Sequence, residues 1–373
     1  QYLHRFFADL DLSQQTPYLP ELPESRDKKV AVIGAGPAGL GAAYFLRLKG
    51  YEVTVFEKLP VAGGMMAVGI PAYRMPRDVL AAEIGIIEKM GVEIKTGVAF
   101  GEDITLDSLK NDGFAAVFLG TGLHLSRKLN VDGEDLPGVL KGVDFLRDVA
   151  LDHDVTVGKR VIVIGGGNVA VDVALTALRK GAEQVSLVCL EKREEMPAWD
   201  YEIEEALEEG IEITNSLGPK RFLEEGSALT GVEFKKCTAV FDETGAFRPA
   251  YDETDLTPME GDTVIVAIGQ AADLSFADKE GISVTQRGGL DADPVTLETS
   301  IEGVFAGGDV FYGPKSVVEA VQCGKEAALS IDRYLEGEDL RKGREQSWDY
   351  EKPETFDEPF VPRTPMRHLP LES

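Results

Sequence analysis

The sequence predicts an α/β protein made of two units of the same kind, each with a parallel sheet covered by helices. The first observation is a strand–helix–strand pattern at residues 28–58 that returns at residues 159–192. The second is that each opening strand ends in a glycine-rich turn. The length of 373 residues suits two domains, and the 43% hydrophobic content supplies their cores.

The first unit begins with the segment "KKVAVIGAG" at residues 28–36, whose apolar run from Val30 is typical of a buried parallel strand. Residues 37–50 show helical periodicity and close with Gly50, and residues 51–58 form the next apolar strand. Upstream, residues 1–27 predict one short amphipathic helix followed by a proline-rich connector.

The second unit repeats this order with a strand at residues 159–167, a helix at 168–181 and a strand at 183–192. An internal repeat of a strand–helix–strand unit indicates two domains of one type. Later in the chain, the segment "IEGVFAGGDV" predicts a further strand, and a helix is expected from about Ser316 to Leu335.

The turn after the first strand carries a dinucleotide-binding fingerprint in Gly34, Gly36 and Gly39. The first glycine allows the tight turn, the second lets the backbone approach a pyrophosphate, and the third lets helix and strand pack closely. The pyrophosphate would meet the positive end of the helix. Glu57 ends the second strand, where its carboxylate can accept hydrogen bonds from ribose hydroxyls.

A second fingerprint follows the later strand, with Gly165 and Gly167, and Ala170 in the third position. Alanine is tolerated there because only packing is involved. Glu191 lies at the end of the next strand, in the ribose-binding position. Two fingerprints predict two bound dinucleotides.

Two other strand ends fit the same plan. The strand ending in "VFLGTG" leads to Thr121 and Gly122, and the strand ending in "VIVAIGQ" leads to Ala267 and Gly269. Each turn would cross beside a bound dinucleotide, although a plain turn is the alternative for each alone.

Composition excludes several classes of function. The formal net charge of −27 argues against nucleic acid and anionic membrane surfaces as partners. It is explained by solubility or, alternatively, by the steering of a basic partner. The apolar stretch at residues 30–46 is explained by the first fingerprint rather than by membrane insertion.

The chain has only three cysteines, Cys189, Cys237 and Cys323, which are far apart in the sequence. They predict no metal or cluster site, no disulfide framework and no redox dithiol, and they suit a reducing cytoplasm. The four histidines are scattered without metal-ligand spacing, which favours surface or loop roles. The acidic segment at residues 199–210 is interpreted as a solvated helix face. No catalytic side chain is predicted.

Several longer strings carry a resemblance to a known family. They are "GAGPAGL", "GGMMAVGIPAYRMP", "GGGNVAVDVA", "REEMPA" and "GGDVFYGPKSVVEAVQCGKEAA". In this order they resemble the small subunit of glutamate synthase, the flavin portion of dihydropyrimidine dehydrogenase and, more distantly, adrenodoxin reductase. The resemblance runs from the first helix to about Leu335. It implies a disulfide-reductase-like flavoprotein with two Rossmann-like domains, the nicotinamide domain being inserted into the FAD domain.

This resemblance predicts the following domain organisation. An N-terminal helix and linker would cover residues 1–27. The FAD-binding domain would comprise residues 28–157 and 270–340, and the NAD(P)-binding domain residues 158–269. Residues 341–373, which are proline-rich and charged, are expected to form an extended tail.

The resemblance also assigns residues to the FAD site. The "GG–GIP–R" segment would lie along FAD, Val98 would touch the adenine, Asp309 would bond the ribityl chain, and the following helix would direct its N-terminus to the flavin pyrimidine edge. The residues implied are Gly34, Gly36, Pro37, Ala38, Glu57, Lys58, Gly63, Gly64, Met65, Arg74, Val98, Gly308, Asp309, Ser316 and Val317.

On the nicotinamide side the resemblance implies Gly167, Asn168, Val169, Ala267 and Gly269. NADPH-using members carry "YRRTREEMPA", whereas the aligned string here is "CLEKREEMPA". The arginine pair that would bind a 2′-phosphate is replaced by Leu190 and Glu191. Glu191 would repel that phosphate, which favours NADH over NADPH.

The neighbouring Lys192 and Arg193 keep NADPH open as the alternative cofactor.

The predicted function is a flavoprotein oxidoreductase that passes a hydride between NADH and FAD. The electrons would continue to an iron–sulfur cluster or ferredoxin-like acceptor in the same complex or polypeptide, because this chain has no redox dithiol. Iron–sulfur clusters are expected only outside this segment, and the chain would be the flavoprotein core of a larger electron-transfer protein. Two alternatives remain, a free-standing ferredoxin–NAD(P) reductase and a non-catalytic flavin sensor or scaffold.

Overall fold

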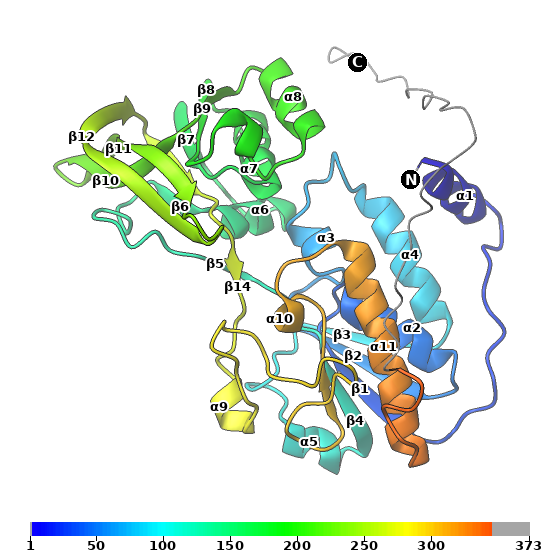
Figure 1. Cartoon of the computed structure of the whole chain (residues 1–373). Helices are drawn as coiled ribbons and strands as arrows, with labels where there is room; N and C mark the ends of the chain where they lie inside the picture. The colour runs from blue at the N-terminus through cyan, green and yellow to red at the C-terminus, as the bar shows by residue number, and fades with distance from the viewer. Residues whose placement is uncertain (1, 345–373) are drawn as a thin grey trace, which may run out of the picture.

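The computed structural model describes residues 2–344, which form two lobes joined by two adjacent chain crossings (Figure 1). The expected tail at 341–373 falls for the most part outside the described residues. Each lobe is built on a five-stranded parallel sheet. The prediction of two Rossmann-like α/β units is therefore confirmed.

The first sheet follows the order β15-β4-β1-β2-β3, and all its pairings are parallel. Its central strand β1 is buried on both faces because its residues alternate between two cores. Val30 and Val32 belong to one core, and Ala31 and Ile33 belong to the other. The strands are β1 Lys29–Ile33, β2 Glu52–Glu57, β3 Glu93–Thr96, β4 Phe114–Leu119 and β15 Val304–Ala306.

Two helices from opposite ends of the chain cover one face of this sheet. Helix α2 (Pro37–Arg47) follows β1, and α11 (Val317–Glu336) lies against it (Figure 1). Their backbones approach so closely that a Cβ on Gly324 would lie 2.2 Å from the carbonyl oxygen of Ala38. The remaining helices of this lobe are α3 Met65–Val68, α4 Arg77–Lys89, α5 Leu106–Asn111, α9 Ala277–Glu280 and α10 Asp309–Tyr312.

The second sheet follows the order β6-β13-β7-β8-β9, and its strands are also parallel. It repeats the first sheet, with β7 in the position of β1 and β13 in the position of β4. Its elements are β6 Val139–Lys141, β7 Arg160–Ile164, β8 Gln184–Val188, β9 Glu212–Thr214, β13 Thr263–Val266, α6 Gly142–Ala150, α7 Asn168–Arg179, the 3₁₀ turn Arg193–Glu195 and α8 Asp200–Glu208.

The two faces of the second sheet have different covers. Val161 and Val163 of β7 pack under the helices, whereas Ile162 and Ile164 pack against a three-stranded antiparallel sheet. That sheet consists of β10 Leu217–Glu225, β11 Ala228–Phe241 and β12 Phe247–Glu260. The long hairpin β11–β12 extends from the lobe (Figure 1).

The two lobes are joined by a short antiparallel pair, β5 (Leu125–Ser126) with β14 (Gln270–Ala271). The sequence placed residues up to 157 in the first domain, but β6 pairs with β13 of the second sheet. The upstream boundary therefore lies near residue 126 rather than at 157/158, because a three-residue strand is too short to be recognised by its periodicity. The downstream crossing lies at β14, where residue 270 was expected to begin the second part of the FAD domain.

The N-terminal segment forms the expected helix, α1 (Tyr2–Leu12), followed by an extended connector. Leu3, Phe6, Phe7 and Leu10 are all exposed on this helix. None of the described helices combines the length and the apolarity needed to cross a membrane.

The close packing of α2 and α11 predicts a strong effect of a single methyl group. Gly324→Ala should destabilise the protein by about 3 kcal/mol, because the new Cβ would collide with the backbone of α2. Urea unfolding followed by circular dichroism measures this change. The matched control is Gly85→Ala in α4, where a Cβ would have no neighbour within 4 Å, and stability should rise by about 0.5 kcal/mol. Equal stability of the two variants would contradict this account of the packing.

Candidate functional site

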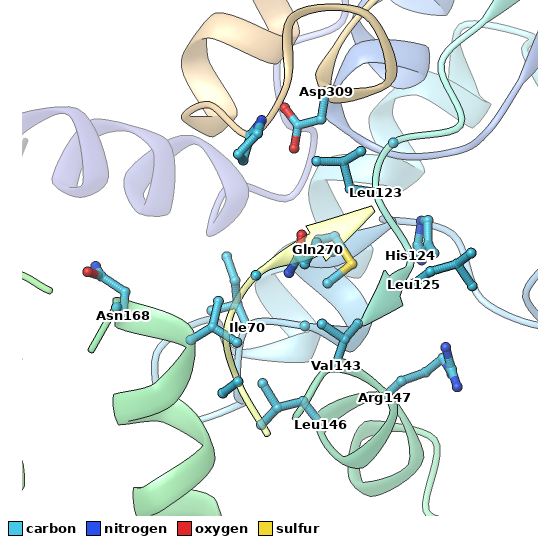
Figure 2. A pocket seen from close by; sticks show the side chains of 18 of the residues that line it. Ile70, Leu123, His124, Leu125, Val143, Leu146, Arg147, Asn168, Gln270 and Asp309 are labelled. Carbon is cyan, nitrogen blue, oxygen red and sulfur yellow. The ribbon is translucent and has the colours of Figure 1, made fainter. Parts of the chain in front are cut away.

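A cavity of about 1280 Å³ lies between the two lobes and is lined by both of them. The carboxyl ends of β1 and β4 border it in the first lobe, and those of β7 and β13 border it in the second. In Figure 2, Asp309 of the first lobe lies at the top of the view and Asn168, at the start of α7, lies at the left, and both line this cavity together with Ile70, Leu123 and Gln270. This is the strand end at which open α/β sheets bind ligands.

Both fingerprint turns have the geometry that requires glycine. Gly34 has a φ of 101°, and a Cβ there would lie 2.5 Å from the carbonyl oxygen of Gly120. Gly165 has a φ of 148°, and a Cβ there would lie 2.3 Å from the carbonyl oxygen of Ala267. The two predicted strand-end turns thus lie beside the two fingerprints.

The N-terminus of α2 opens into the cavity through Gly36, Pro37 and Ala38. Gly39 lies behind them, where a Cβ would come within 1.9 Å of the carbonyl oxygen of Gly34. It therefore serves packing, as its place in the fingerprint predicts. A cavity at this helix end offers free N–H groups and a positive potential to an anion.

The segment after β2 follows the same surface. Gly64 and Met65 line the cavity, and a Cβ on Gly64 would meet Cα of Gly36 at 2.7 Å. Gly63 is not among the lining residues, and its amide donates to the carbonyl of Ala35 at 2.8 Å. This bond holds the segment against the fingerprint turn.

Glu57 reaches the cavity from the end of β2 although it is only 5% exposed. Its carboxylate accepts hydrogen bonds from the amides of Ala35 at 2.7 Å and Leu59 at 2.9 Å. Burial raises the pKa of this carboxyl group, and these amide donors act in the opposite direction. Glu57 thus fastens the turn to β2 and still presents an acceptor to the cavity.

The remaining predicted FAD residues surround the same space. Lys58, Val98, Thr121, Gly122, Asp309, Ser316 and Val317 all line it. The Thr121 hydroxyl is buried and has no hydrogen-bond partner within the described residues. A bound polar ligand would satisfy it.

The Asp309 carboxylate accepts from the Lys315 amide at 3.2 Å, and Ser316 caps α11. Burial raises the pKa of Asp309. Gly308 does not line the cavity but has a φ of 72°, which turns the chain into α10.

In the second lobe Gly165, Gly167, Asn168, Val169, Glu191, Ala267 and Gly269 line the cavity. Ala170 is fully buried, which agrees with a packing role. The Gly34 amide donates to the carbonyl oxygen of Phe56, and the Gly165 amide donates to that of Val188 in the same way. Because Glu57 follows Phe56 and Cys189 follows Val188, Cys189 takes the position equivalent to Glu57.

Glu191 lies two residues after Cys189, but its side chain extends back to the glycine turn that follows β7. Its Oε2 would be 2.6 Å from a Cβ on Gly166.

Lys192 and Arg193 do not line the large cavity. Lys192 lies 3.6 Å from Glu195, and Arg193 lies 3.3 Å from Asp200. Both cations are therefore beside carboxylates of their own segment.

Arg74, which was expected along FAD, also makes contacts between the two lobes. It lines the cavity, but its guanidinium bridges the two lobes by contacting Asp172 of α7 at 2.5 Å and Glu205 of α8 at 3.1 Å. Glu202, 6% exposed, lies 3.7 Å away. Burial raises the pKa of Asp172 to about 6, against the effect of Arg74. Helix α8 is therefore more than the solvated face that its acidic sequence predicted.

His124 lies in a loop, as predicted, and this loop between β4 and β5 forms part of the cavity wall (Figure 2). Burial and, to a smaller extent, Arg147 lower the pKa of its imidazole, which is therefore neutral at pH 7. The apolar wall between the lobes was missed, since Ile70, Val143 and Leu146 lie in no recognised motif. His124 does follow the predicted turn at Thr121–Gly122, and this was the available signal.

All three cysteines are buried free thiols in different parts of the structure. Burial raises the pKa of each thiol, that of Cys189 to about 12. A buried thiol with a raised pKa is a poor nucleophile. The described residues therefore contain no redox-active dithiol next to the cavity.

The family model for pyridine nucleotide-disulphide oxidoreductases matches residues 28–324. The match covers both lobes and the cavity between them. The chain belongs to this family and is an oxidoreductase. Membership supports FAD and a nicotinamide dinucleotide as the cofactors of the two fingerprints.

Curated relatives confirm the resemblance to glutamate synthase small chains. The chain is 49% identical to the NADP(+)-dependent formate dehydrogenase subunit beta of Moorella thermoacetica, over 83% of this chain and 44% of the relative. It is 38% identical to the NAD-dependent dihydropyrimidine dehydrogenase subunit PreT of Escherichia coli, over 90% and 75%. It is 34% identical to the glutamate synthase [NADPH] small chain of Halomonas elongata, over 83% and 68%. The chain thus spans less than half the length of the first of these.

Among solved structures, FprA of Mycobacterium tuberculosis in complex with NADPH has the same fold. The TM-score is 0.70 at 18% identity, covering 84% of this chain and 85% of FprA. This likeness supports the two-lobed architecture.

Arg74 is the shared partner of Asp172, Glu202 and Glu205. We therefore predict that this one cation stabilises the contact between the lobes. Arg74→Met should destabilise the protein by about 3 kcal/mol, because it leaves three partly buried carboxylates without their shared partner. Arg5→Met, which breaks the exposed pair with Asp9, is the control and should cost less than about 1 kcal/mol. Both changes are measured by urea unfolding. Similar losses in the two variants would show that the cluster contributes no more than a surface pair.

Proposed function

We propose that this chain is an FAD-dependent NAD(P)H:acceptor oxidoreductase in which a hydride passes between a nicotinamide and the flavin inside the shared cavity. The observation that carries the proposal is that both glycine fingerprints open into one cavity. Two dinucleotides bound by their pyrophosphates at these turns would extend toward the same space. Holding both reactants in one site removes much of the entropic cost of their encounter.

The residues of the first lobe fit FAD. The N-terminus of α2 would bind the pyrophosphate, and Glu57 would accept a hydrogen bond from the adenosine ribose. Asp309 is available to a ribityl hydroxyl, and the unpartnered Thr121 hydroxyl supports a polar ligand at the turn after β4. When bound, FAD supplies the two-electron redox chemistry.

Helix α11 starts at the cavity with Ser316 and Val317, so its positive end would stabilise negative charge on the flavin pyrimidine edge. The apolar side chains of Ile70, Leu123, Val143 and Leu146 would exclude water from the space between the cofactors. The transfer requires no acid or base from the chain, and we assign no catalytic side chain.

We favour NADH as the nicotinamide cofactor. The Glu191 carboxylate lies against Gly166 in the fingerprint turn, where a 2′-phosphate would meet a negative charge and free ribose hydroxyls would meet an acceptor. Lys192 and Arg193 are beside other carboxylates. The names of the relatives include both NAD and NADP, so the preference rests on this chain's own residues.

The electrons would leave to an iron–sulfur cluster or a ferredoxin-like acceptor in the same complex or polypeptide. Support comes from the three buried thiols, none of which can act as a local dithiol. Support also comes from relatives named as subunits of larger oxidoreductases, one of them an NADPH-Fe(3+) oxidoreductase of Geobacter sulfurreducens. We place the protein in the cytoplasm, where free thiols persist.

The proposed function is tested by anaerobic titration of the purified yellow protein with NADH. The flavin absorbance should be bleached by one equivalent of NADH per FAD. A protein without flavin after reconstitution with FAD, or a flavin that neither NADH nor NADPH bleaches, would contradict the proposal.

The cofactor preference predicts the effect of restoring the arginine pair. The double variant Leu190→Arg, Glu191→Arg should lower the KM for NADPH about tenfold, because a charge-assisted hydrogen bond contributes about 1.5–3 kcal/mol. The wild-type protein should show the lower KM for NADH. Steady-state turnover with an artificial electron acceptor measures both constants. A wild-type KM that is lower for NADPH would overturn the preference.

A further inference from the structure

The hairpin β11–β12 contributes aromatic side chains to the cofactor cavity. Phe247 and Tyr251 of β12 line the same cavity as Gly165 and Glu191, although they lie more than 50 residues from either in the sequence. No sequence motif predicted this approach. The hairpin therefore extends over the second lobe as far as the cavity next to the second fingerprint.

A chain of contacts shows which end of the site the hairpin reaches. Glu191 lies against Gly166 of the fingerprint turn, and its neighbour Leu190 lies against Gly218 of β10. A Cβ on Gly218 would meet Leu190 Cδ2 at 2.9 Å and Tyr251 Cε1 at 2.4 Å. Tyr251 is thus next to Leu190, which lies between Cys189, the residue equivalent to Glu57, and Glu191. It stands at the adenosine end of a dinucleotide.

Tyr251 is held in a fixed place by its neighbours. The Lys235 ammonium lies 4.1 Å from its ring centroid, and Lys235 itself lies 2.6 Å from Glu253. The Gly218 backbone closes another side. A partly buried ring anchored in this way forms a rigid wall without losing side-chain freedom on binding.

Phe247 is the opposite case, because it is 65% exposed. Its ring packs edge-on against the ring of Phe241, with 6.1 Å between the two ring centroids, and it belongs to no hydrophobic core. A large apolar ring that faces a cavity gains free energy when a flat ligand covers it.

We propose that Phe247 and Tyr251, with Leu190 and Pro219, form the subsite for the adenine of the nicotinamide dinucleotide. The inference rests on the proposed function, since it assumes that the second fingerprint binds such a cofactor. It assigns the hairpin a role in cofactor affinity. The adenine is remote from the hydride, so these residues act in binding and not in the transfer.

The test compares Phe247→Ala with Leu256→Ala, a control on the same strand at an exposed apolar residue outside the cavity. Anaerobic stopped-flow reduction of the holoprotein is measured against NADH concentration. In Phe247→Ala the half-saturating NADH concentration should rise about tenfold, because stacking of an aromatic ring on a base contributes on the order of 1–3 kcal/mol. The limiting rate should stay unchanged, and Leu256→Ala should match the wild type.

Reduced nicotinamide mononucleotide, which lacks the adenosine, provides the second measurement. It should reduce the wild type and Phe247→Ala with equal efficiency. A Phe247→Ala protein that is impaired equally with both reductants would show a general structural effect and overturn the proposal. Tyr251→Leu, which keeps apolar bulk, should repeat the effect of Phe247→Ala.

Calorimetric titration with ADP-ribose separates this inference from the proposed function. ADP-ribose binding should weaken about tenfold in Phe247→Ala and remain unchanged in Leu256→Ala. A wild type that binds ADP-ribose through Phe247 but whose flavin is not bleached would refute the proposed function alone. Equal ADP-ribose affinity in Phe247→Ala and the wild type, or no ADP-ribose binding at all, would refute the adenine subsite.

Discussion

The structure depends on the close approach of two backbone turns at the end of each parallel sheet. In the first lobe the Gly34 turn touches the Gly120 turn, and in the second the Gly165 turn touches that of Ala267. Neither contact leaves room for a Cβ atom. The approach keeps side chains away from the carboxyl ends of the central strands, and the helix N-termini open there into a common cavity. The proposed binding of two dinucleotides rests on this one steric constraint, repeated twice.

The relation between the lobes is a second constraint, and contacts of several kinds maintain it. The chain crosses between them at β5 and β14, which pair over only two residues each. Arg74 adds an ionic contact to α7 and α8. Ala150 and Leu151 at the end of α6 also pack against the apolar cluster of α3 and α4, and the Arg179 guanidinium lies 4.3 Å from the centroid of the Tyr73 ring. The cavity is therefore framed by two glycine turns whose lobes are held by both apolar and ionic contacts.

The sequence predicted those parts of the site that depend on local geometry. The fingerprint residues Gly34 and Gly165 could be found because a strand, a glycine turn and a helix follow one another directly. Contacts made across the fold could not be found in this way. Arg74 joins residues about 100 and 130 positions away, and β6 is recognisable as a strand only through its pairing with β13. Phe247 carries no local pattern, so only the folded chain shows that it lines the cavity.

The proposed function depends on direct hydride transfer between a nicotinamide and the flavin in the shared cavity. Anaerobic stopped-flow reduction with NADH deuterated at the transferred C4 position tests it most directly. Flavin bleaching should be slower with the deuterated cofactor, because the C4–hydrogen bond breaks in the step observed. Bleaching at the same rate with both cofactors under saturating conditions, or no bleaching, would contradict it.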